Sequence, residues 1–302
     1  MFYIMPAANT SGSQKPMPHA PGTTGEILPA APSQPSDSPR ALRVGFWHDL
    51  QATLRTILAL MLREMSTRYG RSPGGYMWAV LEPVGGIAVL ALGFSLVMRA
   101  PPLGSSFILF FATGMLPFTL YMELDGAVSR SLRFSKALLA YPAVRWIDAI
   151  LARFLLNVLT KLVITGIVLG GIMLMSDTRT ILNISAILTA LSMAAALGLA
   201  MGVMNCALDG LFPAWDMIWN IITRPIFLAS GILLLYRDMP SHVQDILWWN
   251  PLLHVVGAMR AGFYPMYDSS YVSPTYGFGV ALALLAMGLL LVRRHHLHIL
   301  ND

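Results

Sequence analysis

Three polar side chains with four-residue spacing, Arg153, Asn157 and Lys161, interrupt one long apolar run of the chain, about residues 147–175. Residues four apart lie on one face of a helix, so the three would form a single polar stripe. An isolated charge at the centre of a membrane helix costs roughly 2.5–3.5 kcal/mol. We therefore expect the stripe to face either a water-filled substrate path or a carboxylate of the same chain, for example Glu82. For Arg153 alone, snorkelling to the inner headgroups is an equal alternative.

Three other residues are candidates for the same substrate path. Arg224 interrupts a second apolar run immediately before a proline. Trp248 and Trp249 lie in an interval that we predict to be external, where aromatic faces could stack on sugar rings. Membrane tryptophans more commonly lie at the interface, so a belt role is the simpler alternative for most of them. His254, in the same interval, is expected to be structural.

No motif in the sequence indicates catalysis or a bound cofactor. It contains no GxxxxGK[ST] loop, no HExxH and no GxSxG motif, and none of its three lysines lies in a glycine-rich loop. A single cysteine, Cys206, excludes an intrachain disulfide and a zinc cluster, and is expected to fill a core position in a span. We therefore expect no catalytic residue, no metal and no cofactor in this chain.

The composition is that of an all-α integral membrane protein. Of the 302 residues, 56% are hydrophobic and only 12% are charged, whereas soluble domains have about 25% charged residues. Six apolar runs approach the roughly 20 residues that a bilayer requires. They lie at about residues 76–98, 104–122, 147–175, 180–206, 213–235 and 274–292. The net charge of +5 is placed beside these runs, which is typical of membrane orientation and does not favour nucleic-acid binding.

Three regions of different character follow one another along the chain. Residues 1–40 are rich in Pro, Ser, Gly and Ala and are predicted to be a disordered cytoplasmic tail. Residues 41–72 have apolar residues at three- and four-residue spacing among arginines, which predicts an amphipathic interfacial helix. Residues 73–302 would form the six-span domain, with an external re-entrant hairpin at about 240–266 hinged at Asn250-Pro251.

The charged interval between the second and third spans sets the expected orientation. It carries Arg130, Arg133 and Lys136 among apolar residues, which predicts a short interfacial helix in a cytoplasmic loop. Both termini would then be cytoplasmic. Arg63 and Arg68 on the amphipathic helix would face the same side. We expect these five cations to form the surface on which a soluble partner acts.

Several motifs together resemble the ABC-2-type permeases, and especially the capsular polysaccharide export permeases of Gram-negative bacteria. They are RYGRSPGGYMW at 68–78, LEP at 81–83, TGMLP at 113–117, SKALLAYP at 135–142, WWNPLLH at 248–254 and MRAG at 259–262. The resemblance covers about residues 45–294 and implies the ABC-2 (type V exporter) fold. It also implies a homodimer in the bacterial inner membrane that works with two separate ATP-binding subunits, which hold ATP and Mg. The implied substrate is a lipid-linked polysaccharide, passed to a periplasmic co-polymerase and an outer-membrane exporter.

Three other functions are weighed against this interpretation. Related permeases export O-antigen or teichoic acid, so the polymer is less defined than the mechanism. A membrane enzyme acting on lipid-linked sugars would need an acid and base pair near one face, which the sequence does not offer. A secondary transporter would need ion-coupling carboxylates at mid-membrane, and only Glu82 approaches that position.

Overall fold

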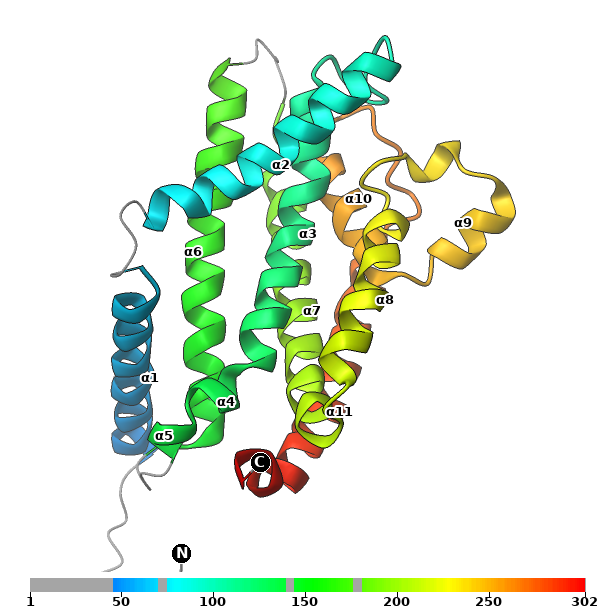
Figure 1. Ribbon diagram of the computed structural model, residues 1–302. Coiled ribbons are helices and arrows are strands. Elements are labelled where there is room, and N and C mark those ends of the chain that lie inside the picture. Colours follow the sequence, from blue (N-terminus) through cyan, green and yellow to red (C-terminus); the bar gives the residue numbers. More distant parts are fainter. Residues whose placement is uncertain (1–45, 70–74, 140–143, 176–180, 302) are drawn as a thin grey trace, which may run out of the picture. The chain divides into compact units, whose positions relative to one another are not determined.

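The computed structural model of the protein describes residues 46–69, 75–139, 144–175 and 181–301, and within them it is helical without any strand (Figure 1). Five helices among these residues are long and apolar enough to cross a membrane. They are α2 (Gly75–Val97), α3 (Phe107–Ser129), α6 (Trp146–Met175), α7 (Ile184–Leu211) and α11 (Pro274–Asn301). These helices match five of the six predicted spans. The predicted disordered tail, 1–40, lies outside the described residues.

Helix α7 is the central element of the bundle, since α3, α10 and α11 all pack on it. Its contact with α3 depends on two small residues one turn apart. A Cβ atom on Gly198 would lie 2.7 Å from Cβ of Leu124, and one on Gly202 would lie 2.6 Å from Cβ of Val128. Small residues at such spacing let two membrane helices approach closely. Cys206 is buried on the same helix, as expected for a core position.

The sixth predicted span, at residues 213–235, is not found among the membrane-length helices. In its place the chain forms α8 (Trp215–Ala229), which contains Pro225 and ends at a turn where Gly231 has a φ of +72°. A helix of 15 residues is about 22 Å long, which is shorter than the roughly 30 Å hydrocarbon core. The prediction of six full spans is therefore not confirmed, because apolar composition alone does not reveal where a helix ends.

Two short helices form the segment for which a hinged hairpin was predicted. After the short helix η1 (Tyr236–Asp238), α9 (Ser241–Leu247) and α10 (Pro251–Phe263) are separated at Asn250. The Asn250 side chain caps α10 by accepting a hydrogen bond from the backbone N–H of Leu252 at 3.0 Å. The two helices are thus separated at the predicted position, while a hinge and re-entry into the outer leaflet stay predictions. Helix α10 is almost entirely buried against α7 and α3.

The segment between α3 and α6 contains two single-turn helices, α4 (Ser131–Phe134) and α5 (Lys136–Leu139). The single interfacial helix predicted here is therefore divided into two. Buried Leu132 joins α4 to a small apolar cluster that includes Val128, Ile150, Val203 and Val292. This cluster fixes α4 to four of the long helices.

Helix α1 (Phe46–Tyr69) packs beside α6, and the two run next to each other in Figure 1. Ile57 and Glu64 are buried on this helix, while Leu54, Leu58 and Leu62 are exposed. The amphipathic helix is thus confirmed as a helix. Its location at the membrane interface stays a prediction.

Candidate functional site

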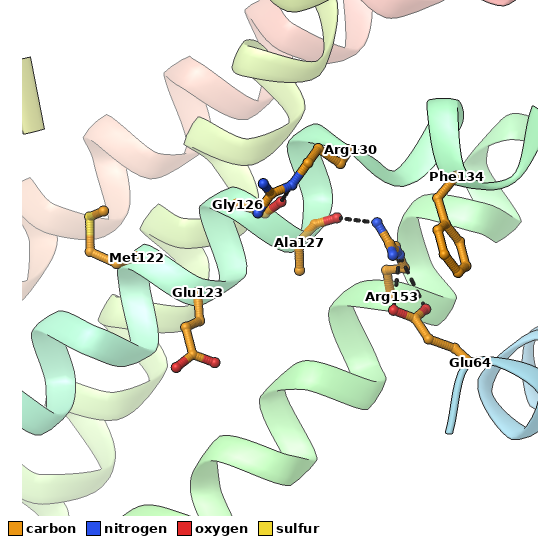
Figure 2. A pocket seen from close by; sticks show the side chains of 8 residues that line it. All are labelled: Glu64, Met122, Glu123, Gly126, Ala127, Arg130, Phe134 and Arg153. Atoms are coloured by element: carbon orange, nitrogen blue, oxygen red, sulfur yellow. Dashed lines mark hydrogen bonds and ion pairs between the residues drawn. The ribbon is translucent and has the colours of Figure 1, made fainter. Parts of the chain in front are cut away.

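A cavity of about 540 Å³ lies between α1, α3, α4 and α6 (Figure 2). Two arginines, two glutamates and four apolar or small residues line it: Glu64, Met122, Glu123, Gly126, Ala127, Arg130, Phe134 and Arg153. The cavity lies beside the last turns of α3 and the early turns of α6. It brings Arg153 of the predicted substrate path close to Arg130 of the predicted coupling surface.

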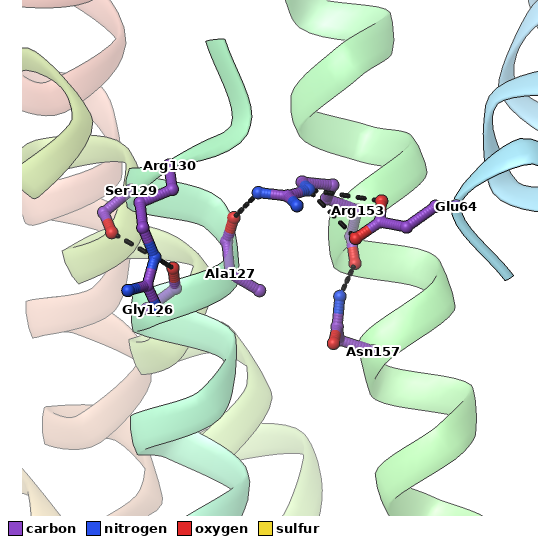
Figure 3. Close-up of polar contacts among 7 residues, drawn as sticks. All are labelled: Glu64, Gly126, Ala127, Ser129, Arg130, Arg153 and Asn157. Carbon is purple, nitrogen blue, oxygen red and sulfur yellow. Dashed lines mark hydrogen bonds and ion pairs between the residues drawn. The ribbon is translucent and has the colours of Figure 1, made fainter. Parts of the chain in front are cut away.

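Arg153 joins three elements at this cavity (Figure 3). Its Nε donates to Oε1 and Oε2 of Glu64 on α1 at 3.0 and 3.2 Å, and its Nη1 donates to the carbonyl oxygen of Ala127 on α3 at 3.2 Å. The guanidinium also lies 4.1 Å from the ring centroid of Phe134. Arginine suits such a site because its planar group can bond a carboxylate and stack on a ring at once. Arg153 is therefore paired within the chain, and whether its guanidinium also lies at the level of the headgroups stays a prediction.

The other two residues of the stripe are also engaged within the chain. Asn157 is buried and donates its side-chain amide to the carbonyl oxygen of Arg153 at 2.7 Å. Lys161 is buried as well and forms an ion pair with Glu123 of α3. Glu82, the example of a partner suggested by the sequence, is exposed on α2. Both cations of the stripe therefore have a carboxylate partner within the chain. The partner of Arg153 is Glu64 and that of Lys161 is Glu123, so neither is the suggested Glu82. Whether the stripe also faces the substrate path stays a prediction.

The residues predicted to couple to a partner lie at the same end of the long helices. Arg130 caps the C-terminal end of α3 and its Nε donates to the carbonyl oxygen of Gly126 at 2.9 Å. Arg133 and Lys136 are exposed and line a second cavity of about 300 Å³ together with Asp209. On α1, Arg63 is exposed and Arg68 lies in the last turn. Their role in coupling is not tested by this arrangement.

The remaining candidates for the substrate path belong to other parts of the bundle. Arg224 is exposed on α8. Trp248 and Trp249 follow α9, where Trp249 is 68% exposed. Both rings pack against Tyr276, and the indole N–H of Trp248 donates to the carbonyl oxygen of Tyr271 at 3.3 Å. Their contacts thus join α9 to the start of α11, and their role along the path stays a prediction.

A buried polar network links α3, α7 and α8, and sequence analysis missed it. Asp125 of α3 accepts hydrogen bonds from the side-chain amide of Asn205 at 2.8 Å and from the indole N–H of Trp219 at 2.7 Å. Asn205 in turn accepts one from the indole N–H of Trp215 at 2.9 Å. The two tryptophans thus attach α8 to the bundle. Their four-residue spacing was the available signal, since it places both indoles on one face.

Arg260 is the second feature that the sequence did not reveal. It falls within the predicted external hairpin, and in the structure it lies in α10 and is only 1% exposed. Its Nη2 donates to the carbonyl oxygen of Ile232 at 2.9 Å, and its guanidinium lies 4.3 Å from the ring centroid of Phe110. Arg260 therefore holds the turn after α8 against α3 and α10.

Comparison with known proteins decides the family. The model of the ABC-2 type transporter family matches residues 55–264, which is more than half of the chain. The chain belongs to the ABC-2 type transporter family. The matched segment runs from α1 to α10 and includes every residue that lines the cavity of about 540 Å³ and the cavity of about 300 Å³.

Curated relatives of this ABC-2 transporter chain are named for polysialic acid transport or for capsule polysaccharide export. The polysialic acid transport protein KpsM of Escherichia coli is 29% identical over 238 residues, covering 79% of this chain and 92% of KpsM. The capsule polysaccharide export inner-membrane protein CtrC of Neisseria meningitidis serogroup B is 26% identical, covering 83% and 95%. The corresponding protein BexB of Haemophilus influenzae is 28% identical, covering 79% and 90%. The similarity thus extends over nearly the full length of each relative.

Proposed function

We propose that this chain is the membrane permease of an ABC transporter that exports a lipid-linked capsular polysaccharide across the bacterial inner membrane. The observation that carries the proposal is the family match over 55–264 together with near full-length similarity to a polysialic acid transport protein and two capsule polysaccharide export proteins. The names of these relatives favour capsule over O-antigen or teichoic acid export. The resemblance further suggests that the polymer passes to a periplasmic co-polymerase and an outer-membrane exporter.

The energy for export would come from other chains. The sequence has no P-loop, so we assign ATP and Mg to two separate ATP-binding subunits that act on a homodimer of the permease. Both termini would be cytoplasmic, which places the end of α3 and the start of α6 on the side of these subunits.

The coupling surface in this proposal consists of α4, α5 and the cationic face of α1. Exposed Arg133 and Lys136 would contact the ATPase, while buried Leu132 of α4 packs on residues of α3, α6, α7 and α11. A displacement of α4 would therefore be transmitted to several spans at once. Arg130, Arg63 and Arg68 would complete the surface.

The proposal is tested by reversing two charges at this surface. We expect an Arg133→Glu/Lys136→Glu permease, co-expressed with its ATPase, to reach the membrane at normal level but to export little polysaccharide to the cell surface. The matched control reverses the exposed pair Arg293 and Arg294 near the end of α11. Normal export by the first variant, or an equal loss in the control, would contradict the coupling surface. Absence of any polysaccharide export by the unaltered pair of proteins would contradict the function itself.

A further inference from the structure

A third cavity, of about 160 Å³, lies inside the bundle where α3, α7, α8, α10 and α11 meet. None of the residues that line it belongs to either cavity described above. Both α8 and the start of α10 contribute to its wall, and most of the lining side chains are aliphatic or aromatic: Tyr121, Leu197, Met201, Trp219, Ile226, Asn250, Pro251, Leu252 and Leu284. The cavity therefore occupies space between α8 and the start of α10.

The polar side chains of this wall offer little to a bound water. The indole N–H of Trp219 is already bonded to Asp125 at 2.7 Å. Asn250 accepts from the backbone N–H of Leu252 at 3.0 Å, and its amide nitrogen lies 3.4 Å from the hydroxyl of the serine that follows α8. That leaves the hydroxyl of Tyr121, whereas a buried water typically makes about three hydrogen bonds. The wall therefore suits an apolar ligand better than water.

The floor of the cavity is buried, and its rim is partly exposed. Tyr121, Leu197 and Leu252 form the floor and are at most 5% exposed. The other lining residues, which include Trp219 and Leu284, are partly exposed. A ligand can therefore reach the floor past the rim from outside the bundle.

Apolar side chains continue from the rim onto the outer surface. Ile222 follows Trp219 by three residues and precedes Ile226 by four, so it lies on the same side of α8, and it is 39% exposed. Met287 follows Leu284 by three residues on α11 and is 52% exposed. Helix α11 is long and apolar enough to cross a membrane, so lipid chains surround it in a bilayer. The molecules nearest to the rim are therefore hydrocarbon chains.

The volume of the cavity selects part of a chain over a whole lipid. An apolar cavity of roughly 150 Å³ stays dry and binds benzene, which has six carbon atoms. A cavity of about 160 Å³ thus has room for about six carbons of a chain. Such a chain gains little hydrophobic free energy on leaving the bilayer, because both environments are apolar. It gains dispersion contacts with a wall that otherwise faces empty space.

We propose that this cavity binds the end of a hydrocarbon chain of a membrane lipid. The chain passes the rim beside Ile222 and Met287, and its last carbons contact the buried side chains of Tyr121 and Leu197. It thereby fills the space between α8 and the start of α10 and stabilises the position of α8. The site recognises the chain and not the headgroup. It is a property of the folded protein in a bilayer, so it does not depend on which polymer the permease exports.

The test is photolabelling of the full-length permease in vesicles of dioleoylphosphatidylcholine. A small share of the lipid is a phosphatidylcholine that carries a diazirine near the end of one chain, and peptide mass spectrometry after irradiation identifies the labelled residues. We expect label on Tyr121 and Leu197, which are 5% and 2% exposed and out of reach for lipids on the outer surface. Tyr264 and Leu109, similarly buried residues of the same types that do not line the cavity, should remain unlabelled.

Filling the cavity gives the matched pair of variants. Leu284→Trp places a large side chain in the cavity from α11 and should abolish the label on Tyr121 and Leu197. Leu282→Trp adds the same side chain two residues earlier, on the other side of α11, where Leu282 is 69% exposed. This control should be labelled as the unaltered protein is. Ile226→Trp fills the cavity from α8 and provides a second test if Leu284→Trp does not fold.

Each of four results would overturn the proposal. Absence of label on both Tyr121 and Leu197 in the unaltered permease would show that chains do not enter. Label that persists in Leu284→Trp and Ile226→Trp would come from outside the cavity. Equal label on Tyr264 would show general penetration of the bundle. Equal labelling of the floor by a lipid with its diazirine beside the headgroup would show that the site does not select the chain end.

Discussion

Trp219 of α8 donates its indole N–H to Asp125 of α3 across a distance of 2.7 Å, and this bond is one of the few that attach α8 to the bundle. Thr223 is the buried residue of α8, while Met217, on the outer side, is 70% exposed. Its apolar contacts with the core are made by the partly buried Ile226 and Phe227 in its last turn. Nearer its start, the indole N–H groups of Trp219 and Trp215 attach it to Asp125 and Asn205.

The first prediction concerns these two indoles. Trp219→Phe leaves an oxygen of the buried Asp125 without its donor, which should destabilise the protein by about 1–3 kcal/mol. Trp215→Phe removes a bond to a neutral amide and should cost about 1 kcal/mol. Trp78→Phe on α2, where the indole is 62% exposed, is the control and should be nearly neutral. Thermal unfolding of the detergent-purified variants measures these losses of stability and ranks the three variants. A Trp219→Phe variant as stable as Trp78→Phe would show that the network does not hold α8.

The second prediction concerns the ion pair between Glu64 and Arg153. Both side chains are largely buried, so removing one partner leaves an uncompensated charge, which should cost about 3–5 kcal/mol. We expect Glu64→Leu and Arg153→Met to destabilise the protein strongly as single variants. The double variant should recover much of the loss, since two apolar side chains can replace a buried pair.

A double-mutant cycle of thermal stabilities measures this coupling. Arg130→Met, which removes an exposed arginine at the same cavity, is the matched control and should change stability little. Independent effects of Glu64→Leu and Arg153→Met, which simply add, would contradict the pairing of α1 with α6.

Sequence analysis predicted the helical class, five of the spans and the separation of two helices at Asn250, because each depends on local composition and capping. It ended the second span at residue 122 because Glu123 and Asp125 follow, whereas α3 continues to Ser129. The partners that make this continuation favourable, Lys161 and Asn205, come from α6 and α7. No local pattern in the sequence reveals such distant partners.

The burial of Arg260 was unpredictable for a related reason. Its guanidinium donates to the carbonyl oxygen of Ile232, which is accessible because the chain turns at Gly231 and does not continue α8. Its aromatic partner, Phe110, lies on α3. The sequence showed an arginine within the predicted external hairpin, and nothing near it in the sequence indicated its partners. Only the packing of α10 against α3 and α7 places that arginine in the interior.

The third prediction concerns pH and His254. Its Nε2 lies 2.8 Å from the carbonyl oxygen of Trp248, and its Nδ1 accepts from the backbone N–H of Ser273 at 3.2 Å. A carbonyl only accepts and an amide only donates, so the ring is neutral with its proton on Nε2. Burial lowers the pKa of His254 below its ordinary value. The neighbouring rings of Trp248, Tyr271 and Tyr276 carry no charge near neutral pH.

Because the pKa of His254 is lower in the folded state, the unfolded segment binds the proton more readily. The stability that His254 contributes is therefore fully present above about pH 6.5 and falls as the pH decreases below that value. We expect hydrogen exchange of the amides in α10 to be better protected at pH 7.5 than at pH 5.5, after correction for intrinsic exchange rates. His254→Gln should lose this dependence, and His242→Gln, an exposed histidine in α9, should keep it. Equal protection of unaltered α10 at both pH values would contradict the prediction.

The last prediction decides whether Lys161 stabilises the bundle or acts on the substrate. Lys161 is buried in α6 and paired with Glu123, whose side chain is 30% exposed toward the cavity. If the lysine serves mainly to balance Glu123, Lys161→Ala should lower the protein level and export together, and adding Glu123→Ala should restore both. Adding Glu82→Ala, which removes an exposed carboxylate on α2, is the control and should restore neither. The ion pair leads us to expect this rescue by Glu123→Ala.

The opposite result is equally informative. Loss of export at normal protein level, without rescue by either carboxylate variant, would place Lys161 on the path of the polymer. Surface polysaccharide and membrane protein level, measured in the same cells, separate the two results.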